Sequence, residues 1–268
     1  MRRLASVTTL AVSVALGSLT WRQTAQYASA DTLYRATIVR NPTCWLCYTN
    51  LGGLLLDGSP QQLREATTVL DQAVRLKPAV PEARLNLGIA LLKEDRPAEA
   101  ASQLREALAL SPDYALAHQN LGNALVKLGH LDEAMTEYER TLRLDPSMSE
   151  AHYNKANLLR VQDKIDDAIA EYEAAVRIDP AFVEARENLG LLLAERGTFD
   201  QALAQLSAAI ATDPKSALAH DNLGVVLWEM GQRDQALLQF TEAIRLDPSY
   251  DPARVHFAEV KAAIGKKE

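Results

Sequence analysis

Small, apolar and polar residues recur along this chain in one pattern that repeats every 34 residues, after a first interval of 36. The tripeptide Asn-Leu-Gly marks one point of the period, and an alanine followed twelve residues later by a proline marks two more. The tripeptides begin at Asn50, Asn86, Asn120, Asn188 and Asn222, with the variant Asn-Lys-Ala at Asn154. The alanine–proline pairs are Ala66–Pro78, Ala100–Pro112, Ala134–Pro146, Ala168–Pro180, Ala202–Pro214 and Ala236–Pro248.

Each period predicts two helices. The small residues let the helices approach closely, and the proline ends the second helix because it has no N–H to donate and clashes with the preceding turn. Leucines follow each tripeptide, and large residues occupy the second helix at Leu70, Leu104, Tyr138, Tyr172, Leu206 and Phe240. The abundance of Ala and Leu also favours helices. The first period has two extra residues near Asp57–Gln62, which predict a longer turn between its helices.

This pattern resembles the tetratricopeptide repeat, which has small residues at its eighth and twentieth positions and proline at its thirty-second. The resemblance implies an all-α, right-handed superhelical solenoid of antiparallel helix hairpins, with six repeats over residues 45–250. Residues 23–42 match a second helix alone, a half-repeat with Ala30 and Tyr34 at the expected places. Residues 251–268 match a first helix alone, which predicts a C-terminal capping helix with His256 at the asparagine position.

The N-terminal segment has a different pattern. Arg2 and Arg3 precede an uncharged run from Leu4 to Trp21. As a helix this run is roughly 26 Å long, slightly shorter than a hydrocarbon core. It fits a single-span anchor, a signal peptide or the last span of a larger membrane protein. The preferred interpretation is a transmembrane anchor, or an uncleaved signal, over residues 1–22. The two arginines then place the repeats on the periplasmic or other extracytoplasmic side.

Residues 20–52 resemble the junction of membrane-bound mannosyltransferase-like proteins, where a final span runs directly into extracytoplasmic repeats. A tryptophan after the span, the tripeptide Thr32–Tyr34, Asn41–Pro42 and the first Asn-Leu-Gly carry this resemblance. It implies an alternative function, as an accessory or C-terminal substrate-presenting module of an envelope protein glycosyltransferase. A membrane glycosyltransferase is then a candidate partner.

The asparagines predict a peptide-binding site. The segment Ala117–Leu125 (AHQNLGNAL) resembles the repeats of O-linked N-acetylglucosamine transferase, in which an asparagine ladder holds a polypeptide by its backbone. An asparagine amide both donates and accepts, so it can pair with one peptide unit. The resemblance implies a ladder of Asn50, Asn86, Asn120, Asn154, Asn188 and Asn222, with Asn123 and Asn157 beside it. In the alternative interpretation these asparagines are repeat consensus and bond within their own hairpins.

The expected function is therefore a membrane-tethered scaffold that binds a polypeptide in its concave groove without catalysing a reaction. The position just before each ladder asparagine is never basic, so the chain lacks a clamp for chaperone carboxylates; toward the C-terminus this position holds Glu187 and Asp221. The net charge of −7 and the lack of a basic run argue against nucleic acid as a partner. No nucleotide, metalloprotease or hydrolase motif is found, and the histidines recur with the repeat. We expect no catalytic residue, metal or cofactor.

Cys44 and Cys47, the two cysteines of the chain, form a C-x-x-C motif at the start of the first repeat. A redox centre requires a βαβ setting, a zinc site requires two further ligands, and haem attachment requires His where Tyr48 stands. Two interpretations of the motif are left: a local disulfide between Cys44 and Cys47, or two cysteines that only pack. The preferred interpretation is packing, with Trp45 and both sulfurs covered by the half-repeat helix. Trp228 is expected to pack against the capping helix, or to be an anchor in the groove.

Overall fold

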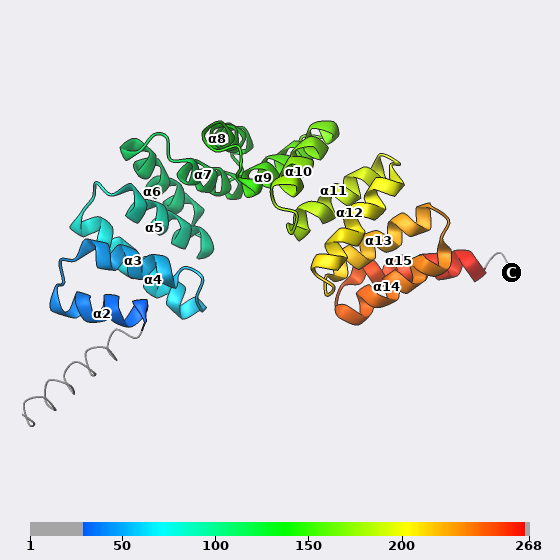
Figure 1. Cartoon of the computed structure of the whole chain (residues 1–268), viewed down its shortest axis with the longest axis horizontal. Coiled ribbons are helices and arrows are strands. Elements are labelled where there is room, and N and C mark those ends of the chain that lie inside the picture. Colours follow the sequence, from blue (N-terminus) through cyan, green and yellow to red (C-terminus); the bar gives the residue numbers. More distant parts are fainter. Residues whose placement is uncertain (1–28, 266–268) are drawn as a thin grey trace, which may run out of the picture. The chain divides into compact units, whose positions relative to one another are not determined.

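The computed structural model describes residues 29–265, and every regular element among them is an α-helix (Figure 1). The all-α prediction is confirmed. The predicted membrane helix, residues 1–22, lies outside the described residues. Within the described part of the chain, none of the helices combines the length and apolar character that a membrane crossing requires. The right-handed superhelix stays a prediction.

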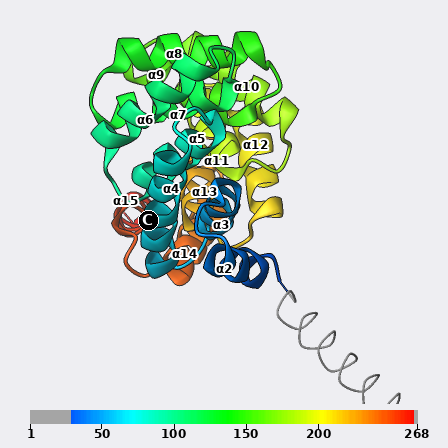
Figure 2. The same cartoon turned by 90° about the vertical axis from the view of Figure 1, so that its left-hand side faces the viewer.

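The chain divides into two compact units, residues 1–134 and 135–268, with the boundary inside α8 (Leu131–Leu144). The first unit contains α2 (Ala30–Arg40), α3 (Trp45–Leu55), α4 (Pro60–Leu76), α5 (Pro81–Lys93), α6 (Pro97–Leu110) and α7 (Ala115–Lys127). Helices α3 and α4 pair as a hairpin, as do α5 and α6, while α2 packs on α3 (Figure 2).

The second unit contains α9 (Ser149–Val161), α10 (Ile165–Ile178), α11 (Val183–Glu195), α12 (Phe199–Thr212), α13 (Ala217–Glu229), α14 (Arg233–Leu246) and α15 (Asp251–Gly265). Its hairpins are α9–α10, α11–α12 and α13–α14, and α15 packs on α14 and α13. Lys261 of α15 is exposed, and it occupies the repeat position that holds a buried leucine in the earlier first helices. This charge suits a helix whose outer face meets water, because a terminal repeat needs a polar outer surface.

Most turns inside the hairpins have the same geometry. After the first helix, one residue adopts a left-handed conformation, and the next N–H reaches back to a leucine carbonyl, which is a Schellman-type helix end. The left-handed residues are Asp95, Gly129, Asp163, Gly197 and Gly231, with φ between 58° and 80°. The bonds are Arg96 N–Leu91 O, His130 N–Leu125 O, Lys164 N–Leu159 O, Thr198 N–Leu193 O and Gln232 N–Leu227 O, at 2.8–2.9 Å.

The first hairpin departs from this geometry. Its connection, residues 56–59, is one residue longer than residues 94–96 of the next hairpin, as predicted, and α4 is also longer, with 17 residues against 14 in α6. The Ser59 side chain accepts a bond from the Gln62 N–H, the Gln62 side chain accepts from the Ser59 N–H, and Pro60 occupies the first helical turn. These are strong helix-start signals, so α4 begins a turn earlier, which accounts for its greater length.

Close contact between small and large side chains holds the described hairpins together, as predicted. A Cβ atom at Gly52, Gly88, Gly190 or Gly224 would come within 2.3–2.7 Å of Leu70, Leu104, Leu206 or Phe240, respectively. The six large second-helix residues are 0–2 % exposed. The leucines that follow the tripeptides are also buried. Within each unit, the interior therefore repeats the same packing contact from one hairpin to the next.

The residue two places before each ladder asparagine, and before His256 in α15, links successive repeats from Arg84 onward. Its side chain reaches back to the carbonyl of the proline that ends the preceding second helix, as in Arg84 Nε to Pro78 O at 2.8 Å and His118 Nε2 to Pro112 O at 2.9 Å. The other examples are His152–Pro146, Arg186–Pro180, His220–Pro214 and Arg254–Pro248. Three of the histidines therefore recur because they bridge repeats.

We predict opposite effects for two neighbouring glycines of α3. Gly52→Ala places a methyl group against buried Leu70 and should lower the free energy of unfolding by about 1–3 kcal/mol. A Cβ at Gly53 meets only the Asn86 amide nitrogen, at an ordinary 3.4 Å. Gly53→Ala should therefore be neutral or stabilise by up to about 1 kcal/mol, because alanine favours a helix. Urea unfolding followed by circular dichroism measures both, and an equal loss for the two variants would contradict the packing argument.

Candidate functional site: the first-helix surface

The predicted ladder asparagines all lie on first helices, one each on α3, α5, α7, α9, α11 and α13. Asn123 and Asn157 stand one helical turn further along α7 and α9, as the sequence predicts. We call the surface formed by the ladder asparagines and their neighbours on these helices the first-helix surface, and describe it for each unit separately. The asparagines have unequal surroundings.

In the first unit the ladder side chains range from exposed to buried. Asn50 is exposed, and Asn86 is half-buried with its amide nitrogen against Gly53. Within the described residues, neither of these amides has a hydrogen-bond partner. Asn120 is buried and its Nδ2 donates to Leu116 O at 2.8 Å in its own helix, as the alternative interpretation expects. Asn123 also has a partner within the chain.

In the second unit two predicted site residues form part of an internal network. The Tyr172 hydroxyl donates to Asn157 Oδ1 at 2.5 Å. Asn188 Nδ2 donates to the same oxygen at 3.3 Å and to the Tyr153 hydroxyl at 3.4 Å. The Tyr153 ring lies between Tyr172 and Phe182, with centroids 5.8 Å and 4.9 Å away. Burial raises the pKa of Tyr172 to about 12. Asn157 and Asn188 thus join α9, α10 and α11 together.

The remaining two ladder residues differ from each other. Asn154 is half-buried and has a partner within the chain. Asn222 is half-buried, and the described residues give its amide no hydrogen bond. The amides that stay open are therefore those of Asn50, Asn86 and Asn222. The sequence could not separate these from the others, because the asparagines occupy equivalent repeat positions.

Two buried carboxylates lie beside the asparagines of α11 and α13. Glu187 is 4 % exposed and Asp221 is 1 % exposed. The Ser216 hydroxyl donates to Glu187 Oε1. Burial raises the pKa of Glu187, and the nearby Glu184 and Asp213 raise it further, while the Ser216 bond opposes them. The sequence showed that these residues are acidic but gave no sign that they are buried.

Asp221 connects the last repeat to the capping helix. Its Oδ1 lies 2.9 Å from Nδ1 of His256 on α15, and its Oδ2 accepts from the Tyr250 hydroxyl at 3.4 Å. Burial and the Asp221 charge raise the pKa of Tyr250 to about 12. Since the carboxylate can only accept, the neutral His256 ring carries its proton on Nδ1, which leaves Nε2 as an acceptor.

A cavity of about 460 Å³ opens between α13, α14 and α15. Trp228, Val225, Phe240, Val260 and His256 line it, together with Glu229, Glu259 and Ala263. Trp228 packs against the core of the second unit and lines this cavity beside α15. Trp228 therefore faces this cavity, and its packing against the capping helix stays a prediction.

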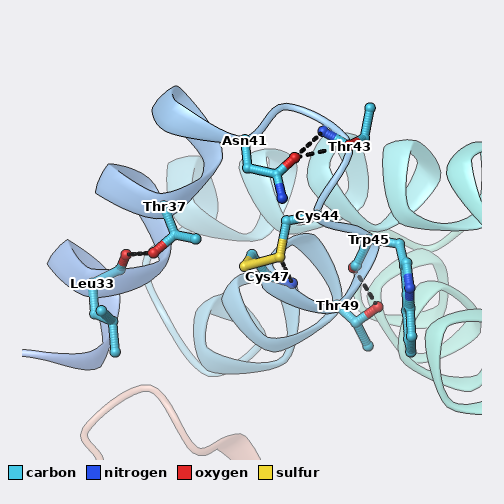
Figure 3. Close-up of a disulfide and its surroundings, with 8 residues drawn as sticks. All are labelled: Leu33, Thr37, Asn41, Thr43, Cys44, Trp45, Cys47 and Thr49. Atoms are coloured by element: carbon cyan, nitrogen blue, oxygen red, sulfur yellow. Dashed lines mark hydrogen bonds between the residues drawn. A yellow bond between two sulfur atoms is a disulfide. The ribbon is translucent and has the colours of Figure 1, made fainter.

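The C-x-x-C motif forms a disulfide between Cys44 and Cys47, so the preferred interpretation of plain packing is wrong (Figure 3). Cys44 is the N-cap of α3, with φ −72° and ψ 76°, and its Sγ accepts from the Cys47 N–H at 3.3 Å. The Cα atoms are 5.3 Å apart, within the range that a disulfide spans. Trp45 points away from the sulfurs and packs against Ala73, Val80 and Ala83.

The described side chains supply no metal centre. Among residues 29–265, no three or more His, Cys, Asp or Glu residues come together in a group that could hold a metal ion. The arrangement offers amides, buried carboxylates and an apolar cavity, which are groups suited to holding a polypeptide.

Comparison with known proteins identifies the family. The tetratricopeptide repeat profile matches residues 61–115, 120–181, 155–217 and 187–251, which together are more than half of the chain. The chain therefore belongs to the tetratricopeptide repeat family and is a scaffold of the protein-binding type. Among curated proteins, none matches the sequence closely enough to count as a relative.

Three solved structures show the likeness. YrrB, described as a tetratricopeptide repeat protein with an unusual peptide-binding site, is 26 % identical, with a TM-score of 0.58, over 69 % of this chain and 95 % of its own. MamA from Desulfovibrio magneticus RS-1 is 25 % identical, with a TM-score of 0.57, over 64 % and 97 %. PilF from Pseudomonas aeruginosa, at 19 % identity and a TM-score of 0.71 over 82 % and 97 %, shares the fold. The resemblances to the two glycosyltransferase classes stay predictions.

We predict that removing the Glu187 charge changes the pH dependence of stability. The folded-state pKa of Glu187 is higher than its unfolded-state pKa. The stability that Glu187 contributes is therefore full at low pH and is lost as the pH rises from the unfolded-state pKa through the folded-state pKa. Glu187→Gln keeps an acceptor for Ser216 and should give a protein that is more stable than the parent at pH 7–8, with a flatter pH profile. Thermal unfolding from pH 4 to pH 8 measures this. Glu195→Gln, at the exposed C-terminal end of the same helix, is the control, and matching profiles for both variants would refute the prediction.

Proposed function

We propose that the first-helix surface binds an extended polypeptide segment through its backbone. The observation that carries this proposal is the open amides, Asn50 and Asn86 in the first unit and Asn222 in the second, each presented from a first helix without a hydrogen bond to the described residues. The peptide-binding site of YrrB, a protein 26 % identical over most of the repeats, supports the same kind of ligand. We also propose, as part of this function, that the first helices line a concave groove in which the segment lies.

The amides suit backbone recognition because each one offers a donor and an acceptor to a single peptide unit. A hydrogen bond of this kind contributes about 0.5–1.5 kcal/mol net, because both partners give up water to form it. The one or two such amides of each unit alone give weak binding, so additional contacts must supply the rest of the affinity. Backbone recognition is also tolerant of sequence, which suits a scaffold that holds a disordered segment.

Charge favours a ligand with basic residues. The chain has a net charge of −7, and the first helices of the second unit carry the buried carboxylates of Glu187 and Asp221. A lysine or arginine near these groups gains attraction, whereas an acidic segment is repelled.

We predict that open and internally bonded asparagines respond differently to replacement. Asn86→Ala should weaken binding of an extended peptide by about fivefold, the loss of one hydrogen bond, with little change in melting temperature. Asn157→Ala removes the acceptor of buried Tyr172 and should lower the melting temperature instead. Fluorescence anisotropy with a labelled peptide library and thermal unfolding separate the two effects. Thr68→Ala, an exposed position on α4, is the control. Unchanged affinity in the triple variant Asn50→Ala, Asn86→Ala, Asn222→Ala would contradict the hypothesis that these asparagines bind the peptide.

We further propose that residues 4–21 tether the scaffold to a membrane, with the repeats on the extracytoplasmic side. The uncharged run behind Arg2 and Arg3 supports this proposal. The full chain should sediment with membranes and resist extraction by carbonate. A double variant, Val12→Arg and Leu16→Arg, should move it into the soluble fraction, because each charge at a helix centre costs about 2.5–3.5 kcal/mol of insertion. Recovery of the parent chain in the soluble fraction would refute the tether.

The resemblance of residues 20–52 to mannosyltransferase-like junctions supports a second candidate, in which the repeats present acceptor proteins to an envelope glycosyltransferase. Crosslinking in intact membranes, followed by isolation of the anchored chain, distinguishes the two. A many-span glycosyltransferase among the crosslinked proteins would favour the second candidate. Crosslinks to extended polypeptide segments alone would favour the first.

A further inference from the structure

The cavity between α13, α14 and α15 lies next to the proposed peptide path. Its wall includes His256, which stands at the asparagine position of the capping helix, and Val225, three residues beyond Asn222. A chain held by the Asn222 amide therefore passes close to this cavity. At about 460 Å³ the cavity is large enough for one bulky side chain.

Most of the residues that line the cavity are apolar. Trp228, Phe240, Val225 and Val260 supply aromatic and aliphatic walls. Phe240 and Val260 belong to the core of the second unit, so these walls are fixed by packing. Trp228 is half-buried, with the Arg233 guanidinium 5.8 Å from its ring centroid. An apolar side chain that enters the cavity exchanges water for these surfaces, which is favourable.

The rim carries negative charge. Glu229 on α13 and Glu259 on α15 line the cavity and are exposed. Neither residue has an ion pair within the described residues. Of the described residues that line the cavity, none is a lysine or arginine, and Arg233 lies over the Trp228 ring rather than in the lining. The two rim carboxylates therefore favour a positively charged group beside the apolar side chain.

His256 adds a directional contact. Buried Asp221 holds its Nδ1–H, so Nε2 of the neutral ring is an acceptor for a peptide N–H. The ring stacks at 5.6 Å from Phe240, which fixes its orientation against the cavity wall. A peptide could thus meet three features of this cavity. Its backbone N–H would bond to His256, its apolar side chain would contact the apolar walls, and a neighbouring cation would face the rim carboxylates.

We propose that this cavity binds a peptide whose bulky apolar residue, such as leucine or phenylalanine, is followed or preceded by lysine or arginine. The inference rests on the proposed peptide-binding function and specifies the ligand class for its C-terminal part. The apolar side chain fills the cavity, the basic residue meets Glu229 and Glu259, and the backbone N–H bonds to His256.

The test uses the full chain, kept in solution by a mild detergent, and three labelled peptides of equal length. They share a backbone and carry Leu-Lys, Leu-Glu or Ala-Lys at their centre. The Leu-Lys peptide should bind about threefold to tenfold more tightly than either of the others. Glu229→Lys with Glu259→Lys should invert the order of Leu-Lys and Leu-Glu. Glu195→Lys, at the same repeat position as Glu229 but one repeat earlier and also exposed, should leave the order unchanged.

A cavity-filling variant tests the location. Ala263→Phe should weaken Leu-Lys binding at least tenfold, with unchanged circular dichroism showing that the fold is intact, while the binding of Ala-Lys stays the same. Equal affinities for Leu-Lys and Leu-Glu, or an effect of Glu195→Lys equal to that of the double charge reversal, would overturn this inference and leave the general peptide site standing. Binding of none of the peptides would overturn both. Dimerisation of the protein alone, abolished by Ala263→Phe, would assign the cavity to a second copy instead.

Discussion

The contact between a small residue on each first helix and a large side chain on its second helix sets the geometry of the whole protein. At Gly52, Gly88, Gly190 and Gly224 there is no room for a Cβ atom beside the partner side chain. This close approach fixes the distance between the two helices and buries the leucine layer behind it, with each buried side chain contributing about 1.5–3 kcal/mol. The opposite edge of each first helix then faces outward and carries the ladder asparagines.

The asparagines on that edge have two kinds of surroundings. Neighbouring side chains decide whether an asparagine amide bonds inside the protein or stays open. Asn157 and Asn188 stand beside Tyr172 and Tyr153, whose hydroxyls need partners where they are buried, so their amides are used inside the protein. Asn50, Asn86 and Asn222 lack such a neighbour and keep their amides open among the described residues. The proposed backbone recognition would therefore fall on a subset of the repeats, whereas Asn157 and Asn188 join neighbouring helices of the second unit.

The second unit retains features that lower its stability. Burying a carboxylate costs free energy, and the same burial raises the pKa of Glu187. Glu187 and Asp221 are nevertheless both buried, on the first helices α11 and α13. Asp221 also orients His256 and receives the Tyr250 hydroxyl, so it joins the last repeat to α15. Such costs are commonly tolerated where a surface must bind something, because a purely apolar replacement would remove the recognition.

The sequence by itself determined the all-α class, the repeat length, the helix pairs and the layer of small and large residues, because each depends on a local pattern repeated many times. It also explained three of the histidines, His118, His152 and His220, by their repeat position. Tertiary structure decided the rest. It lengthened α4 in the first repeat, joined Cys44 to Cys47 at the N-cap of α3, and buried Glu187 and Asp221. Equivalent positions in a repeat differ only in their neighbours, and those neighbours come from other helices.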